Sequence, residues 1–378
     1  MLLRKLFRPI YLYFLFVAFF FIQVMNGFNE TNSFSQTRIL PIVIILILGW
    51  YLKRVKVQKT FGRFATLLAV YMSCVAILQM GFSVSVISSI ISFAFWVLVL
   101  HQVKGMKIND FDIGVISIIM AIACNMCAIT YSYNFVRWRF ELDHDTRVGA
   151  VNSIYYILTM LPFVFYLKKW WLTLALSIMP LYAFIVSGKT TCLLCGTLII
   201  SYNMWHNISK LRWSSKIAFF IGLCCCLTLA VKNVDFSLMN SDISDDFDSG
   251  GNGRSEIALK VMRLLEQEDN PMFLIFGHGV NSISAKIGIG GHNDYLELLF
   301  CYGIIGLLLF LGFWKELLNG LKWFYKESDI KAGFIVSLIV LFFSSFASKL
   351  LATQIGMLSL SLFWGVTYAY KNSTINKV

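Results

Sequence analysis

The polar cluster most suited to chemistry contains His292, Asn293, Asp294 and Glu297, which follow a glycine-rich turn and lead directly into an apolar stretch. Residues 288–314 read GIGGHNDYLELLFCYGIIGLLLFLGFW. An unperturbed histidine has a pKa of about 6.5, so His292 can exchange a proton near neutral pH. A helix N-terminus offers free N–H groups and a partial positive charge, which favour an anion beside it. The cluster therefore predicts proton transfer and anion binding at the start of a helix.

A structural interpretation accounts for part of this cluster. Asp294 can cap the start of the helix, and Glu297 can reach back to the cap as in an aspartate version of the capping box. That interpretation needs only Asp294 and Glu297. It leaves His292 and Asn293 outside the cap, and we therefore predict that both contribute to a functional site.

Three cations and one amide extend the candidate site. Arg254 begins an amphipathic segment, Arg147 precedes a predicted span beside Asn152, and Lys189 lies in SGKTT before another span. Arginine is suited to bidentate contacts with phosphate. Taken singly, Arg147 and Lys189 can also be interfacial residues whose charges reach toward water. Together, these residues on the outer side of the membrane predict a site for a phosphorylated ligand.

The composition indicates which elements position these residues. Of 378 residues, 58% are hydrophobic and 14% are charged, whereas soluble globular proteins have about 45–50% apolar and about 25% charged residues. Several continuous apolar stretches approach the roughly 20 residues that a spanning helix needs, without the alternation of a membrane β-strand. We predict an all-α polytopic membrane protein with about twelve transmembrane helices, near 9–27, 38–52, 63–80, 83–101, 112–131, 151–167, 171–187, 190–205, 216–231, 295–314, 332–347 and 354–370.

The basic residues predict the topology. With the N-terminus in the cytoplasm, most of the 32 Lys and Arg residues fall on cytoplasmic connections, as the positive-inside rule requires. Both termini are then cytoplasmic, and the first apolar run is expected to stay as an uncleaved span because no small-x-small cleavage site follows it. The formal net charge of +12 thus reflects topology. We expect no nucleic-acid partner.

Residues 1–378 are expected to form one integral membrane domain with two long periplasmic loops, at 132–150 and 232–294. The second loop opens with an acidic, Ser/Gly-rich stretch typical of flexible segments. Apolar residues then recur at helical spacing from 255 to 268, which predicts an amphipathic helix that ends at Asn270–Pro271. We expect this helix to lie flat on the outer surface of the bilayer as a lid. An apolar segment, MFLIFGHG, and a glycine-rich turn follow it.

The nine cysteines all fall within predicted spans. Two CxxC spacings occur among them, but metal binding requires thiolates, which hydrocarbon disfavours. We therefore interpret the cysteines as small apolar side chains. Apart from the flexible run Asp245, Asp246 and Asp248, no cluster with metal-ligand spacing faces the periplasm. No metal and no cofactor is expected.

The segment from Arg254 to Gly306 resembles the O-antigen polymerase and O-antigen ligase family. Members carry an arginine followed by a helix in a large periplasmic loop, then a G-x-G stretch, then an H-N-x-Y-L-E-like motif that runs into a span. The corresponding positions here are Arg254, Gly277 and Gly279, His292 to Glu297, and Tyr302 to Gly306. RVGAVNSI and SGKTT are similar to two earlier family features, with Gly-Lys where many relatives have Ser-Arg. The first five spans match only in hydropathy.

The resemblance implies a glycosyltransferase of the membrane-embedded C superfamily, which acts at the outer face of a bacterial inner membrane. The donor would be a glycan on undecaprenyl diphosphate, and the acceptor would be a sugar hydroxyl. Arg254 and Arg147, supported by Lys189, would hold the diphosphate. His292 would act as base or hydrogen-bond donor, Asn293 would position the substrate, and Glu297 would orient His292 or the acceptor. Transfer would be independent of metal and invert the anomeric centre, and a chain-length regulator protein is a further partner to consider.

Two other functions remain open from the sequence. A ligase would transfer the glycan to lipid A–core, whereas a polymerase extends another lipid-linked repeat unit; many divergent relatives of this length are polymerases, which favours polymerase. A flippase for lipid-linked oligosaccharide would place ionisable residues in mid-membrane and often shows paired broken repeats. The predicted spans carry few charges and show no repeat, which disfavours transport.

Overall fold

The computed structural model describes residues 61–81, 84–141, 154–167, 170–187, 189–208, 254–288, 290–291, 293–324, 328–348, 350–351 and 354–375, with helical pieces at 213–214, 216–217 and 221. These residues form helices and no strand, so the all-α class is confirmed for this part of the chain. The predicted spans at 9–27 and 38–52, most of 216–231 and the first third of the loop at 232–294 (residues 232–253) lie outside the described residues.

The helices follow the apolar stretches of the sequence. They are α3 (Arg63–Met80), α4 (Val84–Lys104), α5 (Asp110–Glu141), α7 (Ile154–Val164), α8 (Trp170–Ser187), α9 (Thr190–Ile208), α12 (Arg254–Glu266), α13 (Pro271–Phe276), α14 (Ser282–Ile287), α15 (Asp294–Gly320), the 3-10 turn η2 (Leu321–Phe324), α16 (Ser328–Ala347) and α17 (Gln354–Ile375). By length and composition, three described segments can cross a membrane: Asp110–Asn134, Asp294–Gly320 and Asp329–Ala347. These apolar helices are compatible with a membrane protein.

Two parts of the predicted loops are helical. Helix α5 continues through Glu141, so it includes the first half of the segment at 132–150. The amphipathic helix predicted over 255–268 is confirmed as α12, with Ile257 and Val261 buried while Lys260 and Arg263 are exposed. Asn270 and Pro271 do not end α12, because α12 already ends at Glu266. Instead, the Asn270 side chain accepts a hydrogen bond from the Met272 amide at 3.0 Å and caps α13.

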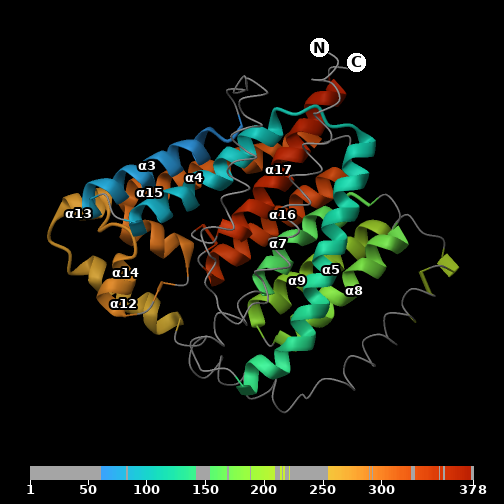
Figure 1. Cartoon of the computed structure of the whole chain (residues 1–378), viewed down its shortest axis with the longest axis horizontal. Coiled ribbons are helices and arrows are strands. Elements are labelled where there is room, and N and C mark those ends of the chain that lie inside the picture. Colours follow the sequence, from blue (N-terminus) through green and yellow to red (C-terminus); the bar gives the residue numbers. More distant parts are fainter. Residues whose placement is uncertain are drawn as a thin grey trace.

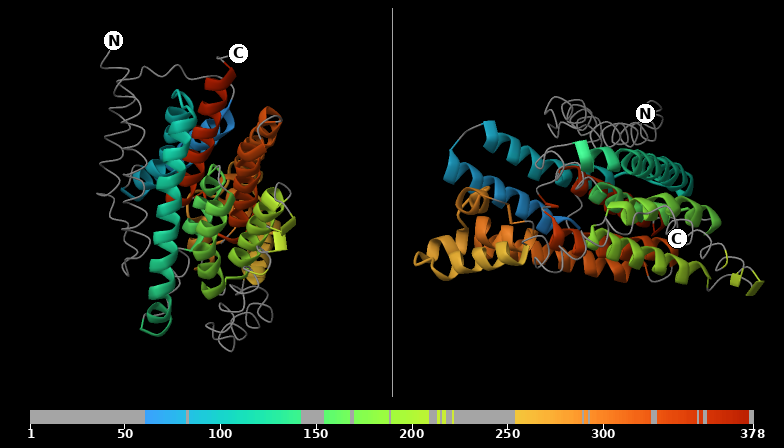
Figure 2. Two further views of the ribbon diagram at one scale, coloured as in Figure 1. Left: turned by 90° about the vertical axis from the view of Figure 1, so that its right-hand side faces the viewer. Right: turned by 90° about the horizontal axis from the view of Figure 1, so that it is seen from below.

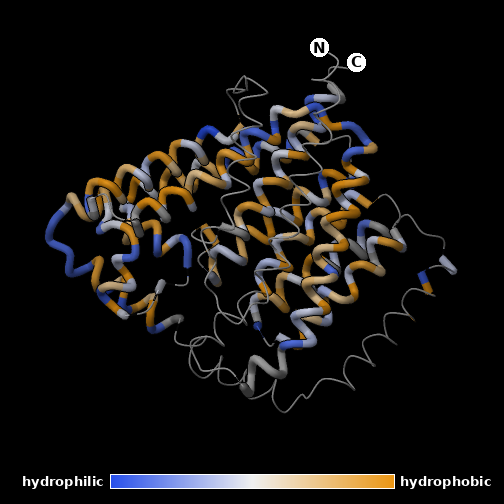
Figure 3. The backbone as a smooth tube through the Cα atoms, viewed as in Figure 1, coloured by the Kyte–Doolittle hydropathy of each residue, from blue (hydrophilic) through white to orange (hydrophobic). Residues whose placement is uncertain are grey.

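The long helices pack into one connected bundle. Helix α17 packs along α4, α5 packs against α7 and α8, and α16 packs against α7 and α9, while α3 packs against α4 and α15. The short helices α12, α13 and α14 lie at the end of the molecule opposite α8 (Figures 1 and 2). Hydrophobic residues run along α3, α4 and α15, and hydrophilic residues concentrate near helix ends, including the turn between α12 and α13 (Figure 3).

Two hydrogen bonds inside the helical core join polar groups of different helices. The Trp364 Nε1 donates to the Ser337 hydroxyl at 2.9 Å, and the Ser359 hydroxyl donates to the Thr159 carbonyl at 3.0 Å. Both contacts join different helices and are fully buried. Because an unsatisfied polar group is costly in an apolar interior, these bonds fix how α16, α17 and α7 meet.

Helices α3 and α15 are joined at the start of α3. The Glu316 carboxylate of α15 accepts hydrogen bonds from the amides of Gly62 and Phe64, at 3.1 and 3.3 Å. The first amides of a helix have no partner within the helix. Glu316 supplies that partner from a distant part of the sequence and therefore sets the position of α15 along α3.

Candidate functional site

Helix α15 is broken at Gly303, where φ is 64° and ψ is −170°. The rings of Tyr295 and Phe310 lie 5.5 Å apart. In a continuous helix, residues with this separation in sequence would lie about 22 Å apart along the axis. The first arm of α15 (294–302) therefore turns back toward the second arm (304–320). The prediction of an uninterrupted span at 295–314 is wrong in this respect.

The break depends on close contact between two backbones. A Cβ atom on Gly303 would lie 2.2 Å from the Ile275 carbonyl oxygen, and one on Gly277 would lie 2.3 Å from the Cys301 carbonyl oxygen. Both glycines have positive φ values, 64° and 83°. Only glycine fits such a conformation at so short an approach. Residues 275–277 at the end of α13 thus lie directly against the break in α15.

Residues 277–279 supply hydrogen bonds that the broken helix lacks. The amide of His278 donates to the Phe300 carbonyl at 3.0 Å, and the amide of Gly279 donates to the Cys301 carbonyl at 2.8 Å. A broken helix at membrane depth is tolerated where neighbouring groups satisfy the freed backbone. The GHG stretch, known from the sequence only through a resemblance, therefore completes the end of the first arm of α15.

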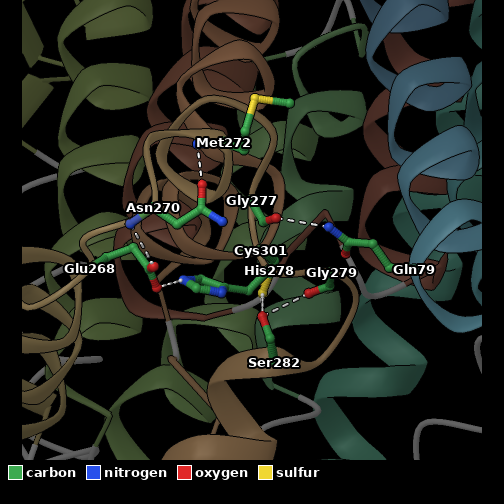
Figure 4. Close-up of polar contacts among 9 residues, drawn as sticks. All are labelled: Gln79, Glu268, Asn270, Met272, Gly277, His278, Gly279, Ser282 and Cys301. Atoms are coloured by element: carbon green, nitrogen blue, oxygen red, sulfur yellow. Dashed lines mark hydrogen bonds and ion pairs between the residues drawn. The ribbon is translucent and has the colours of Figure 1, made fainter.

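Helix α3 also contacts the break in α15 and the end of α13. The Tyr71 hydroxyl lies within hydrogen-bond distance of the carbonyls of Tyr302 and Phe276, at 2.9 and 3.2 Å. The Gln79 side-chain amide donates to the Gly277 carbonyl at 2.8 Å (Figure 4). We name this junction of α3, α13 and α15 the α13–α15 corner.

The helix cap at the polar cluster is one residue earlier than predicted. The Asn293 Oδ1 accepts hydrogen bonds from the amides of Tyr295 and Leu296, at 2.9 and 3.2 Å, so Asn293 is the cap and the prediction for Asp294 is wrong. Asp294 is instead 2% exposed and accepts a hydrogen bond from the Leu351 amide at 3.2 Å. Asp294 thus joins α15 to the connection between α16 and α17.

Glu297 reaches back as expected, but to a different residue. Its Oε1 accepts a hydrogen bond from the Gly291 amide at 2.7 Å, rather than from the amide of the cap residue. A Cβ on Gly291 would lie 3.1 Å from the same oxygen, so the glycine allows this contact. The carboxylate therefore fixes the turn that immediately precedes His292.

A pocket of about 170 Å³ lies beside Glu297. Its lining comes from the first arm of α15, from α3 and α4, from the residues after α13 and from Leu351. The polar lining residues are Ser89, Ser92, Asn281, Asp294 and Glu297. None of the described lining residues is Lys, Arg or His. The pocket can therefore bind groups that donate hydrogen bonds, such as hydroxyls, more readily than anions.

The predicted site residues are only partly brought together. Glu297 lines the pocket, and Asn293 lies one turn of helix earlier in the chain. Arg254 begins α12, which packs against α14 and α15. Lys189 is half-buried before α9 and is not part of the described pocket lining. Arg147, Asn152 and His292 lie outside the described residues.

Sequence reasoning missed several pocket residues. Ser89 and Ser92 lie in an apolar helix, Asn281 follows the GHG stretch, and none has a recognisable motif. The signal that was available is the density of serines in the run SVSVISSIIS at the start of α4. Only the packing of α4 against the rest of the bundle shows that two of these hydroxyls reach a cavity with carboxylates.

His278, predicted to be a loop residue, lies between α13 and α14 in a defined environment. Its ring is 4.7 Å from that of Phe273 and 4.5 Å from that of Phe300. Its Nε2 lies 3.1 Å from the Glu268 carboxylate (Figure 4). Burial and then Lys286 lower the pKa of His278, while Glu268 opposes this change. These contacts attach residues 277–279 to the end of α12.

No group of three His, Cys, Asp or Glu side chains is placed to hold a metal ion among the residues that the structure describes. No family model matches the chain. No curated protein shows significant similarity to it. The candidate site therefore has to be interpreted from its own residues and from the resemblance of its motifs.

Proposed function

We propose that the chain is an O-antigen polymerase, a glycosyltransferase that joins repeat units carried on undecaprenyl diphosphate at the periplasmic face of a bacterial inner membrane. The observation that carries this proposal is the position of Glu297. This residue of the HNDYLE segment lines the pocket and also bonds to the Gly291 amide, next to His292 in the chain. Such an arrangement suits a reaction that needs both a sugar subsite and an adjacent proton acceptor.

In the proposed reaction, an acceptor hydroxyl attacks the anomeric carbon of the donor glycan with inversion. A carbon–oxygen bond to the acceptor forms while the bond to the diphosphate oxygen breaks, and undecaprenyl diphosphate leaves with the electron pair. His292 takes the hydroxyl proton as general base. Arg254 and Arg147, supported by Lys189, bind the diphosphate, since charge placed at a leaving group is usually the largest catalytic contribution.

The lining of the pocket supports a division of the site into two subsites. Carboxylates accept hydrogen bonds from sugar hydroxyls but repel a diphosphate. We therefore assign the acceptor sugar to the pocket, with Glu297 orienting one hydroxyl. The Asn293 oxygen is used by the helix cap, so its NH₂ group is the part that can contact substrate. Asn152 is assigned, as in the sequence prediction, to substrate binding near Arg147.

A direct assay tests the proposal. Purified protein in liposomes is supplied with a defined undecaprenyl-diphosphate oligosaccharide, with and without chelator, and the products are resolved by length. We expect lipid-linked products of two or more repeat units in both conditions. His292→Ala and Arg254→Ala are expected to slow transfer by about 10²–10⁴-fold.

The matched control for Arg254 is Arg263→Ala, which removes the same charge from the exposed last turn of the same helix. Its activity is expected to match that of the unaltered protein. Full product ladders from His292→Ala and Arg254→Ala at normal protein levels would falsify the assignment. Complete inhibition by chelator would contradict the metal-independent mechanism.

Two alternatives have their own readouts. Lipopolysaccharide from a deletion strain with one repeat unit on the core indicates loss of a polymerase, and lipopolysaccharide with none indicates loss of a ligase. The break in α15 is the observation that favours the flippase alternative, because discontinuous helices also form the binding sites of transporters. A flippase would move the lipid-linked oligosaccharide across the liposome bilayer without lengthening it.

A further inference from the structure

Helix α13 is an apolar helix with no buried residue. The sequence of this helix is PMFLIF, and four of its large side chains are exposed: Met272 by 57%, Phe273 by 39%, Ile275 by 40% and Phe276 by 40%. Side chains of this size favour an apolar environment over water. Exposed apolar groups this close together mark a surface that contacts a membrane or another protein.

The position of α13 is fixed by its backbone. The Phe276 carbonyl faces the Tyr71 hydroxyl at 3.2 Å, and the Gly277 carbonyl accepts a hydrogen bond from Gln79 at 2.8 Å. Tyr71 lies at the middle of α3 and Gln79 near its end, and Ile275 lies against the break in α15. Helix α13 is therefore attached to α3 and α15, and its exposed side chains are part of the surface of that bundle.

The neighbouring surface is apolar as well. On α3, Val70 and Leu78 are exposed, and on the second arm of α15, Ile304 is exposed. The exposed apolar side chains of α13 thus lie beside exposed apolar side chains of α3 and of the second arm of α15. The exposed face of α12 is charged in contrast, because Arg263 and Glu266 lie on the same side of the helix as Leu259 and Met262.

A polar boundary limits this surface on one side. Residues 267–270, which connect α12 to α13, read QEDN and are mostly exposed. Figure 3 shows them as the hydrophilic turn between the two short helices. A segment with an apolar face and an adjacent polar edge matches a membrane interface, where the apolar face contacts acyl chains and the polar edge contacts water.

We propose that α13 is immersed in the acyl-chain region of the outer leaflet. The occupant of this surface is bilayer lipid, because the surface is continuous with the apolar outside of α3 and α15. The loop expected at 232–294 then includes one segment, α13, that lies at membrane depth and not in water. This proposal does not depend on the chemistry assigned to the pocket.

The experiment uses the full-length protein in liposomes with a solvatochromic fluorescent amino acid at one position. Phe276 is the test site, Met272 is a second test site, and Asp269 is the matched control in the adjacent polar turn. Liposomes contain phosphatidylcholine and phosphatidylglycerol, with or without bromine on the acyl chains, and iodide is added to the water. Variants are used only if they are monodisperse in detergent.

We expect Phe276 and Met272 to emit at shorter wavelength than Asp269, to be quenched several-fold more by brominated lipid, and to resist iodide. Quenching of Phe276 and Met272 by iodide but not by brominated lipid would overturn the proposal. Protection that disappears when the protein is diluted into excess lipid would overturn it too, since a second copy of the chain would then be the occupant.

Discussion

The helical core and the α13–α15 corner satisfy their backbones in different ways. In the core, represented by α7, α16 and α17, the backbones bond within each helix, and the bonds between helices come from side chains such as Trp364 and Ser359. At the corner, carbonyls of α15 bond to the amides of His278 and Gly279, which come from another segment. A continuous helix requires only apolar composition, whereas a broken helix requires a specific partner.

This difference indicates where the chain departs from regular, continuous helices. Gly303 has a backbone conformation that is essentially restricted to glycine, and such conformations persist only when the surroundings impose them. The pocket with its two carboxylates lies beside this conformation, whereas the polar pairs of the core are fully buried. We therefore interpret the core as the scaffold and the corner as the part adapted to function.

The largest effect is expected from Gly303→Ala. The new Cβ would meet the Ile275 carbonyl at 2.2 Å in a backbone conformation of positive φ, which costs at least about 1–3 kcal/mol before any clash is counted. We expect a lower thermal midpoint in detergent and transfer reduced by more than about 10-fold, because a single ångström of misplacement can have such an effect.

Gly114→Ala is the control for this substitution. Gly114 lies within α5 and has no atom within 4 Å of an added Cβ. Alanine there is expected to be neutral or to stabilise the helix by up to about 1 kcal/mol. Equal behaviour of the two variants would mean that the corner has no special role.

Two substitutions, each of which removes one hydrogen-bonding group, test the difference between the corner and the core. Tyr71→Phe removes the hydroxyl that faces Tyr302 and Phe276 at the corner, and Trp364→Phe removes the Nε1 that bonds to Ser337 in the core. Each is expected to lower the free energy of unfolding by about 0.5–1.5 kcal/mol. Only Tyr71→Phe is expected to slow transfer, which is measured in the liposome assay at equal amounts of folded protein. Equal slowing by Trp364→Phe would remove the distinction between scaffold and corner.

The smallest effect concerns pH at the corner. Burial and Lys286 depress the pKa of His278 below its usual value of 6.5, so the unfolded chain binds a proton that the folded chain excludes. The contribution to stability is complete above pH 6.5 and is lost as the pH falls below that value toward the depressed pKa.

The direction of this pKa shift predicts that the unaltered protein and the His278→Gln variant respond differently to pH. Between about pH 7.5 and about pH 5.5, the thermal midpoint of the unaltered protein is expected to fall by about 1–3 °C more than that of His278→Gln. Trp364→Phe serves as the comparison from the core and is expected to follow the unaltered protein. A steeper pH dependence in His278→Gln would show that the sign is wrong.

The sequence predicted the helices well where composition alone determines them. Helix α3 was predicted at 63–80 and is found at Arg63–Met80, and α8 was predicted at 171–187 and is found at Trp170–Ser187. The break at Gly303 was not predicted, because a glycine inside an apolar run is also compatible with a continuous helix. Its conformation depends on Gly277, which is distant in sequence.

Of the candidate site residues, Glu297 was chosen as part of the HNDYLE segment, and it lines the pocket. Its role in catalysis stays a prediction. The cap was placed one residue late, since Asn and Asp have nearly equal preference for that position. Ser89 and Ser92 carry no local signal of their role, because a serine in an apolar helix more often bonds to its own backbone.

The contact between Glu316 and the Gly62 amide joins residues 254 positions apart. During synthesis, α3 emerges long before Glu316 does, so the first amides of α3 must rely on interfacial water until the last part of the chain is made. The alignment of α3 is therefore completed late in biogenesis. A ribosome that stalls before residue 316 would leave the first turn of α3 without this carboxylate, however many helices had already been inserted.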